Sequence, residues 1–124
     1  MAEWVRVSNP ARGTVLAERC RMARSMRDRT VGLLGTASLP AGEGLWIERS
    51  PSIHMFFMGY AIDAVFVDAD DRVVRVVEQL RPWRAVLWAR GARDCVELPA
   101  GSVAGTATAV GDQLAREPVA PEGS

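Results

Sequence analysis

The residues with the greatest chemical scope lie in two short stretches of this chain, one around His54 and one from Arg81 to Arg84. His54 is the only histidine, and it interrupts an otherwise apolar run from Ile53 to Met58. A histidine titrates near neutral pH, so it could serve as a general base or as a metal ligand. A lone histidine in an apolar run is more often a core residue with hydrogen-bonded nitrogens, and this alternative stays open.

The Arg81-Pro82-Trp83-Arg84 stretch places a flat indole between two guanidinium groups. Proline restricts the backbone, and guanidinium groups recognise carboxylates and phosphates through paired hydrogen bonds. The stretch could therefore bind a carboxylate, a phosphate or a sugar. It could equally be a surface turn in which the tryptophan packs beneath an arginine side chain.

Metal chemistry has little support in the sequence, and we expect neither a metal nor another cofactor. His54 has no second histidine beside it, and Cys20 and Cys95 lack the paired spacing of a zinc site. The aspartates from Asp68 to Asp71 lack the glycine and the terminal glutamate of an EF-hand, so we interpret them as a turn. Two cysteines suggest a reduced protein, although a single bridge between them stays open.

Composition indicates an ordinary globular domain with no bias toward a charged partner. The chain has 124 residues, of which 48% are hydrophobic and 24% charged, and 15 basic residues balance 15 acidic ones. A net charge of zero gives no reason to expect nucleic acid or an anionic membrane as partner. No apolar run approaches the roughly 18 residues of a membrane span, and the N-terminus does not read as a signal segment. We expect a soluble, cytoplasmic protein with one domain over residues 1–116 and a flexible tail over residues 117–124.

The pattern of elements predicts an α+β fold dominated by strands. Short strands alternate with turn signals, which is typical of a compact, mostly antiparallel barrel or sandwich. The clearest element is a β-hairpin over Ala64–Glu78, and one short helix is predicted near residues 25–34, with Ser25 as its cap and Gly35 as its stop. The other predicted strands are Trp4–Val7, Thr14–Met22, Leu45–Ile47, Ile53–Met58, Ala85–Ala89 and Cys95–Leu98. A single helical turn capped by Ser102 is expected through Ala107, and a turn with a last short strand is expected over Val110–Leu114.

Several motifs occur together along the chain and point to a family. They are Arg29–Gly35, Gly42–Ile47, Ser52–Met58, Ile62–Asp68, Arg81–Arg84, Gly91–Arg93 and Glu97–Gly101. With them, the chain resembles the uncharacterised prokaryotic family known as domain of unknown function 192, over roughly Val15 to Leu114. The resemblance implies a small β-rich single domain with one helix near its start, and it brings no established activity, cofactor or catalytic residue.

The family pattern directs attention to His54, Phe56, Met58, Asp63 and the stretch Arg81–Arg84. The most similar subgroup carries an arginine where this chain has Gly59. This chain therefore lacks that positive charge beside His54, which counts against an anion bound at this point.

Three functions are compatible with these residues. The first and preferred one is a binding module for a small polar ligand or a peptide end, using His54, Asp63 and the Arg81, Trp83 and Arg84 side chains. The second is a structural or interaction protein that pairs through an exposed sheet edge. The third is a hydrolase-like enzyme with His54 as base and Asp63 orienting it, for which the sequence offers no evident nucleophile.

Overall fold

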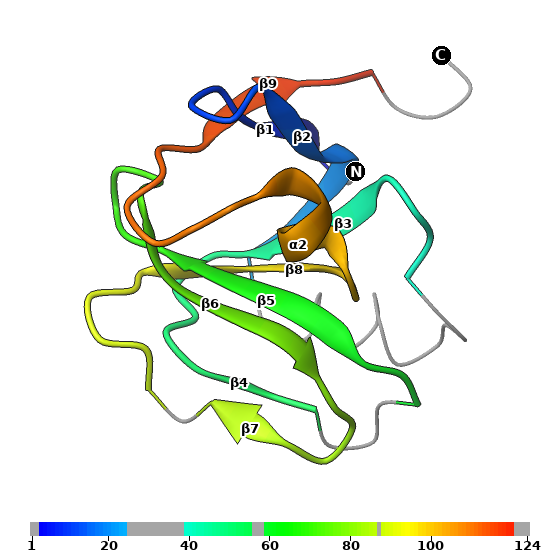
Figure 1. Cartoon of the computed structure of the whole chain (residues 1–124), viewed down its shortest axis with the longest axis vertical. Helices are drawn as coiled ribbons and strands as arrows, with labels where there is room; N and C mark the ends of the chain where they lie inside the picture. Colours follow the sequence, from blue (N-terminus) through cyan, green and yellow to red (C-terminus); the bar gives the residue numbers. More distant parts are fainter. Residues whose placement is uncertain (1–2, 25–38, 56–58, 87, 121–124) are drawn as a thin grey trace.

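The computed structural model describes residues 3–24, 39–55, 59–86 and 88–120. Strands dominate this part of the chain, and one short helix, α2, follows β8 (Figure 1). The predicted helix near residues 25–34 lies outside the described residues. The elements are β1 Trp4–Asn9, β2 Thr14–Ala23, β3 Glu43–Ile47, β4 Ile53–His54, β5 Ile62–Val67, β6 Val73–Leu80, β7 Ala85–Val86, β8 Asp94–Pro99, α2 Ser102–Thr106 and β9 Ala115–Pro118.

A seven-stranded sheet in the order β6-β5-β8-β3-β2-β1-β9 forms the body of the described chain. Its strand pairs are antiparallel except for β2 and β3, which run parallel. A parallel pair requires a long crossover connection, and residues 24–42 provide it here. The fold class, a β-dominated α+β protein with mostly antiparallel pairing, is thereby confirmed.

The sheet is open, so the closed barrel that we considered is not what the described residues form. Strands β6 and β9 lie at the two ends of the strand order. The segments beside them meet around one isolated bridge, between Arg72 and Gln113, where a few backbone hydrogen bonds such as Val73 N–H to the Asp112 carbonyl at 2.8 Å also join them. The sheet therefore curls until its edges approach each other, but a continuous ladder of hydrogen bonds does not close it.

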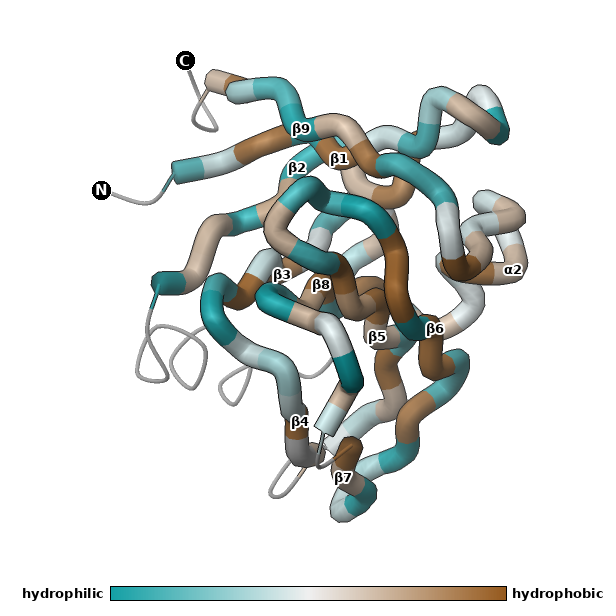
Figure 2. The backbone as a smooth tube through the Cα atoms, turned by 90° about the vertical axis from the view of Figure 1, so that its left-hand side faces the viewer, coloured by the Kyte–Doolittle hydropathy of each residue, from teal (hydrophilic) through white to brown (hydrophobic). Residues whose placement is uncertain are grey.

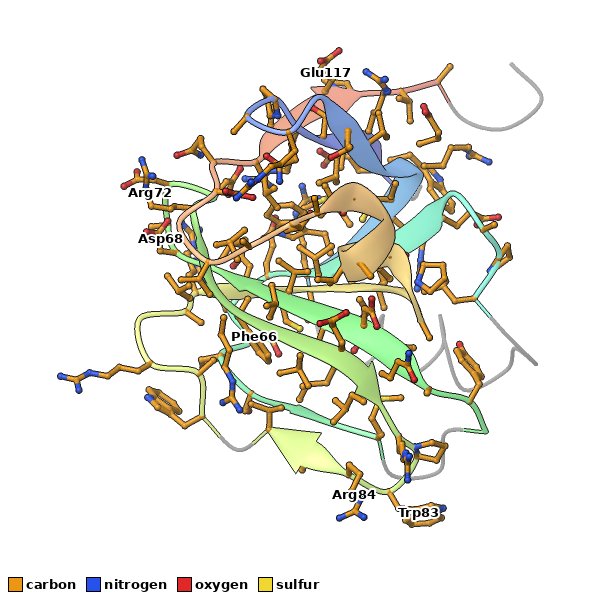
Figure 3. The ribbon with its side chains drawn as sticks, in the orientation of Figure 1. Phe66, Asp68, Arg72, Trp83, Arg84 and Glu117 are labelled. Carbon is orange, nitrogen blue, oxygen red and sulfur yellow. The ribbon has the colours of Figure 1, made fainter. Side chains whose placement is uncertain are left out.

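The predicted hairpin is confirmed and extends slightly further than its sequence pattern indicated. Strand β5 pairs with β6 from Ile62 opposite Leu80 to Val67 opposite Val73. Asp68 shapes the turn, because its Oδ1 accepts hydrogen bonds from the backbone N–H groups of Asp70 at 2.9 Å and Arg72 at 3.0 Å. Figure 3 shows Asp68 and Arg72 at this turn, on the left side of the view and far from Trp83 and Arg84 at its lower end.

Three other predicted elements differ from the structure in their extent. Of the expected strand Ile53–Met58, β4 covers Ile53–His54, and residues 56–58 lie outside the described part. Of the expected strand Ala85–Ala89, β7 covers Ala85–Val86, Leu87 lies outside the described part, and the Ala89 N–H donates to the Pro51 carbonyl at 2.7 Å. The last strand is Ala115–Pro118 rather than Val110–Leu114. Its pairing with β1 reaches Pro118, while the domain boundary at residue 116 stays a prediction.

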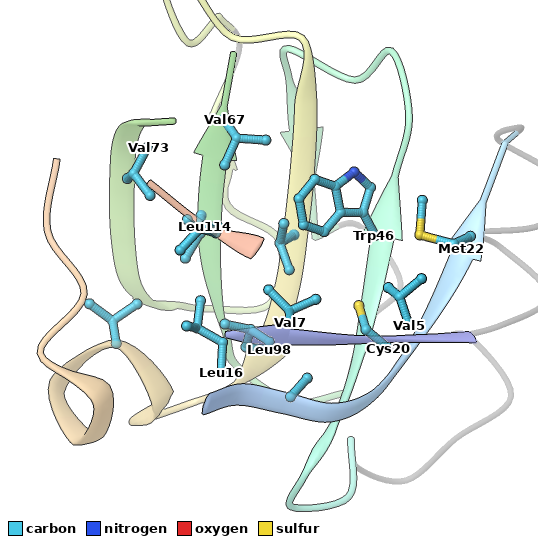
Figure 4. Packing of buried hydrophobic residues seen from close by; sticks show 14 residues of the cluster. Val5, Val7, Leu16, Cys20, Met22, Trp46, Val67, Val73, Leu98 and Leu114 are labelled. Atoms are coloured by element: carbon cyan, nitrogen blue, oxygen red, sulfur yellow. The ribbon is translucent and has the colours of Figure 1, made fainter. Parts of the chain in front are cut away.

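Two buried apolar clusters cover the two faces of the sheet. The first contains Trp46, Val96 and Val103 of α2, and Figure 4 shows its packing around Trp46. The second contains Phe66 and Cys95 from the sheet, together with residues of β4 and β7. Alternate residues of β8 point to the two clusters, as the two-residue period of a strand requires. The sheet is therefore covered by α2 on one side and by the β4–β7 pair on the other.

Strands β4 and β7 form a separate two-stranded sheet at one end of the molecule. Figure 2 shows them together at the end opposite β1 and β9. Ile53 pairs with Val86 and His54 with Ala85. Ile53, Met55 and Val86 are buried in the second cluster, which attaches this small sheet to the larger one. This attachment fixes the position of the Arg81–Arg84 turn.

Candidate functional site

The Arg81–Arg84 turn is held against the strand that carries His54. The Trp83 N–H donates to the Met55 carbonyl at 2.8 Å, and the Met55 N–H donates to the Arg84 carbonyl at 2.8 Å. The turn closes on itself through the Arg84 N–H and the Arg81 carbonyl at 3.2 Å. The structure thus brings the two stretches that the sequence singled out side by side through their backbones.

Trp83 adopts a backbone conformation that large side chains seldom take. Its φ angle is +67°, in the left-handed region, and its side chain is 60% exposed. The left-handed conformation destabilises a non-glycine residue by about 1 kcal/mol. Because the indole is mostly exposed, its partial burial offsets this strain only in part. Such local strain with an exposed aromatic ring is characteristic of recognition surfaces more than of folding anchors.

The two arginines beside Trp83 lie at the surface of the described structure. Arg81 and Arg84 are exposed residues. Within the described part of the chain, no carboxylate forms an ion pair with either of them. Figure 3 shows Arg84 and Trp83 projecting outward at the end of the molecule. The arrangement places a flat ring beside two exposed planar cations, and the binding of an anion there stays a prediction.

His54 is placed through its backbone alone. It pairs with Ala85, one residue after Arg84. Its side chain lies outside what the structure describes, so its role as a base or ligand-binding group stays a prediction.

Asp63 occupies a different position from the other predicted site residues. It is fully buried, and three backbone N–H groups donate to its carboxylate. Oδ1 accepts from Gln79 at 2.8 Å, and Oδ2 accepts from Gly101 at 3.1 Å and Val103 at 2.8 Å. Because both oxygens are engaged with backbone donors, the geometry gives Asp63 a structural role at the start of α2 and at the end of β6.

Glu97 is a buried acidic residue that the sequence reasoning did not select. It is fully buried in β8, and it pairs with Leu45 on one side and Ala64 on the other. Residues directly opposite each other in antiparallel strands share a face, so Glu97 points to the second apolar cluster, where Met55 is also buried. The signal in the sequence was a glutamate in the middle of the apolar strand Cys95–Leu98.

The cysteines do not offer a nucleophile. Both are fully buried, and no disulfide joins them. Cys20 belongs to the first cluster and Cys95 to the second, so they lie on opposite faces of the sheet. Burial raises the pKa of the Cys20 thiol to about 12. No group of metal-binding side chains occurs among the described residues, and no helix there is long and apolar enough to cross a membrane.

Comparison with known proteins identifies relatives of the chain. The sequence model of the DUF192 family, described as "Uncharacterized ACR", matches residues 7–116. A UPF0127 protein of Thermococcus sibiricus is 32% identical over 114 residues, which cover 86% of this chain and 71% of that protein. A UPF0127 protein of Pyrococcus furiosus is 38% identical over 63 residues, covering 51% of this chain and 53% of the relative.

Two solved structures share the fold. A protein of unknown function from Novosphingobium aromaticivorans superposes with a TM-score of 0.75 at 22% identity, covering 90% of this chain and 83% of that one. A Sinorhizobium meliloti protein, provisionally described as a transcription regulator, superposes with a TM-score of 0.78 at 20% identity, covering 94% of each chain. At this level of identity the likeness extends to the fold alone.

Proposed function

This chain belongs to the DUF192 family, and because that membership assigns no activity, we propose from the geometry that it is a binding module for a small ligand or peptide end bearing a carboxylate. The proposed contact surface is the Arg81–Arg84 turn. The observation that carries the proposal is Trp83, which is 60% exposed and held in a left-handed conformation by its hydrogen bond to Met55.

The chemistry of the turn favours a carboxylate over a neutral ligand. A guanidinium group donates two parallel hydrogen bonds to a carboxylate, and these charge-assisted bonds are stronger than neutral ones. The Trp83 ring provides a flat apolar surface for the rest of the ligand. Because β4 fixes the turn, little backbone ordering remains to be done on binding, which favours affinity.

The hydrolase alternative receives less support from the described residues. Asp63 is engaged with three backbone donors, and both cysteines are buried. A catalytic scheme with Asp63 orienting His54 would require the carboxylate to leave those donors. The proposal therefore stays with binding. The absence of a Cys20–Cys95 bridge is compatible with a reducing compartment, and we propose the cytoplasm as the site of action.

A titration followed by two-dimensional NMR tests the proposal. The probe is N-acetylated Gly-Val-Ala with a free C-terminal carboxylate, and the comparison is the same peptide with a C-terminal amide. We expect the free acid to shift the backbone amide signals of Arg81 and of residues 83–86, and the amide form to bind at least about tenfold more weakly.

Two variants assign the binding to the turn. Arg84→Gln removes one guanidinium group and should weaken binding of the free acid, whereas Arg75→Gln removes an exposed arginine of β6 and should leave it unchanged. Equal binding of the acid and the amide, or equal loss in both variants, contradicts the proposal.

A further inference from the structure

The segment that follows the proposed site continues its chemistry. Residues 79–93 contain four arginines and no acidic residue, although the whole chain has a net charge of zero. All four arginines are exposed. Arg93 lies 3.7 Å from the neighbouring Asp94, whereas Arg81, Arg84 and Arg90 form no ion pair with any described carboxylate. The positive charge is therefore concentrated on one segment and not neutralised there.

A second exposed tryptophan lies on the same segment. Trp88 is 67% exposed, and the large hydrophobic residues exposed in the described part are Trp83, Trp88 and Val110. Trp88 lies five positions after Trp83, so at most about 17 Å of chain separates their Cα atoms. That limit is larger than a single terminal carboxylate and equals the length of about five residues of an extended ligand.

The strand between the two tryptophans has an unpaired edge in the described structure. Strand β7 pairs with β4, and Figure 1 shows β7 on the outer side of that pair. Val86 is buried under the pair while Ala85 is exposed. A strand edge offers backbone donors and acceptors to an extended peptide, which can add to the sheet as a further strand.

We propose that the outer edge of β7 (Ala85–Val86), with the exposed side chains of Trp83, Arg84, Trp88 and Arg90 on either side of it, binds an extended acidic peptide as an added strand. This inference rests on the proposed function and names its ligand class. Carboxylate side chains of the peptide pair with Arg81, Arg84 and Arg90, and its apolar side chains pack on the two indole rings. The backbone of β7 supplies the hydrogen bonds that fix the register.

A peptide accounts for this surface better than a single-stranded nucleic acid does. Bases could stack on the exposed indoles and phosphates could pair with the arginines. A nucleic acid would nevertheless leave the strand edge between the indoles unused. The net charge of zero also provides no extended positive field of the kind that gathers a polyanion.

The test uses the full chain and a blocked peptide. The probe is the heptapeptide Glu-Val-Glu-Val-Glu-Val-Glu, acetylated and amidated so that it has no terminal carboxylate. A second form carries N-methyl groups on alternate amides, which removes backbone donors and retains every side chain. Calorimetry should give binding of the first form at low salt and binding weaker by about tenfold or more for the N-methylated form.

Variants locate the peptide on β7. Trp88→Ser should weaken heptapeptide binding by about tenfold and Arg90→Gln by about fivefold, because buried aromatic and arginine contacts dominate interfaces. The same two variants should leave binding of the short free acid at the Arg81–Arg84 turn unchanged. Arg75→Gln is the matched control and should retain full affinity for both ligands.

Each outcome decides between the two proposals. Binding of the short acid together with no gain for the heptapeptide overturns the strand-addition proposal and leaves the proposed function intact. Equal affinity for the N-methylated peptide overturns strand addition as the mode. Tighter binding of an octamer of thymidylate than of the heptapeptide, lost in Trp88→Ser, overturns the peptide in favour of nucleic acid.

Discussion

The carboxylate of Asp63 receives a 2.8 Å hydrogen bond from the backbone N–H of Gln79, two residues before Arg81. Gln79 has a φ angle of +51°, and the pairing of β5 with β6 shifts register here, from Ile62 opposite Leu80 to Ala64 opposite Val77. Two residues of β6 thus face Asp63, which is the geometry of a β-bulge, and a bulge redirects its strand. Asp63 therefore sets the path of the chain into the Arg81–Arg84 turn.

Asp63→Asn should be strongly destabilising. The asparagine retains one acceptor, but its NH₂ group faces backbone donors of Gly101 and Val103 or of Gln79. Leaving buried donors unsatisfied should lower the free energy of unfolding by about 2–3 kcal/mol in urea titrations. Asp68→Asn is the matched control, because the Asp68 bonds use one oxygen in a partly exposed turn, and it should cost less than about 1 kcal/mol. Equal effects of the two substitutions would refute the structural role of Asp63.

Gly44→Ala tests the packing between β3 and β8. A Cβ atom at Gly44 would lie 3.0 Å from Leu98 Cδ2, 3.2 Å from the Glu97 carbonyl oxygen and 3.3 Å from Cys20 Sγ. Overpacking of this kind should lower the free energy of unfolding by about 1–3 kcal/mol. At Gly59 a Cβ would meet no atom within 4 Å, so Gly59→Ala should change stability by less than about 0.5 kcal/mol. A Gly44→Ala protein as stable as wild type contradicts this packing.

Local patterns in the sequence were enough to predict some elements and not others. The hairpin followed from two β-branched runs around Asp68–Asp71, because it depends on neighbours in the chain. The helical turn was also predicted, but its cap was wrong: Gly101 is the N-cap, and the Ser102 hydroxyl donates to the Pro99 carbonyl at 2.7 Å. The roles of Asp63 and Glu97 depend on register: each is paired with strands distant in sequence, as Asp63 with Leu98 and Glu97 with Leu45. A single sequence does not contain that register, so it indicates neither the backbone donors around Asp63 nor the burial of Glu97.

The same distinction explains the candidate site. The Arg81–Arg84 turn was predicted from its own residues, and its turn geometry is local. Its attachment to Met55 depends on the separate β4–β7 sheet, and that sheet consists of two-residue strands with no detectable periodicity. Short strands of this kind exist because the second apolar cluster buries Ile53 and Val86.

Acid should weaken the fold through Asp112. Arg12, Asn9 and the Ala109 N–H all donate to this carboxylate, so its pKa lies well below the ordinary value. A carboxyl with a lowered pKa stabilises the folded chain above about pH 4, and that contribution is lost as the pH falls through the folded-state value. Between about pH 5 and about pH 2.5, the urea concentration at the unfolding midpoint should therefore fall more steeply for wild type than for Asp112→Asn.

Asp71 provides a control, because its pKa is shifted in the opposite direction from that of Asp112. Its burial raises its pKa, with Arg116 acting against that effect. A raised pKa means that protonation favours the folded chain, so Asp71 offsets part of the acid loss. Asp71→Asn should consequently steepen the decline of the urea midpoint in acid, whereas Asp112→Asn should flatten it. Parallel declines in all three proteins contradict the assignment.

The Cys20 thiol should be unreactive in the folded protein. Burial raises its pKa to about 12, and the thiolate is the reacting form. In the Cys95→Ser variant, where Cys20 is the remaining thiol, an aromatic disulfide reagent at pH 8 should label the native protein at the rate of unfolding. In about 8 M urea, where the protein is unfolded, the same thiol should react within the mixing time. Rapid native labelling of Cys20 with a linear dependence on reagent concentration would show that the first cluster is accessible.

Substitution of Trp46 should lower the stability of the fold, whereas substitution of Trp83 should change it little. The Trp46 indole is fully buried, its N–H donates to Asp94 at 2.8 Å, and the Arg116 guanidinium lies 4.3 Å from its ring centre. Trp46→Phe leaves the Asp94 carboxylate without that donor and should lower the free energy of unfolding by about 2 kcal/mol. Trp83→Asn replaces a mostly exposed ring by a residue that tolerates the left-handed backbone, so stability should stay within about 1 kcal/mol of wild type.

The effects of substituting these two residues on ligand binding should be the reverse of their effects on stability. If the Trp83 ring contacts the ligand, Trp83→Asn should weaken binding of the acetylated free-acid peptide by about tenfold at unchanged stability. Trp46→Phe, measured at a temperature where the variant is fully folded, should bind as wild type does, since Trp46 lies in the first cluster and the turn is attached through the second. Strained, exposed residues are retained at recognition surfaces because they stabilise the complex with the ligand rather than the free protein. If Trp83→Asn instead lowers stability as much as Trp46→Phe does, Trp83 contributes to folding.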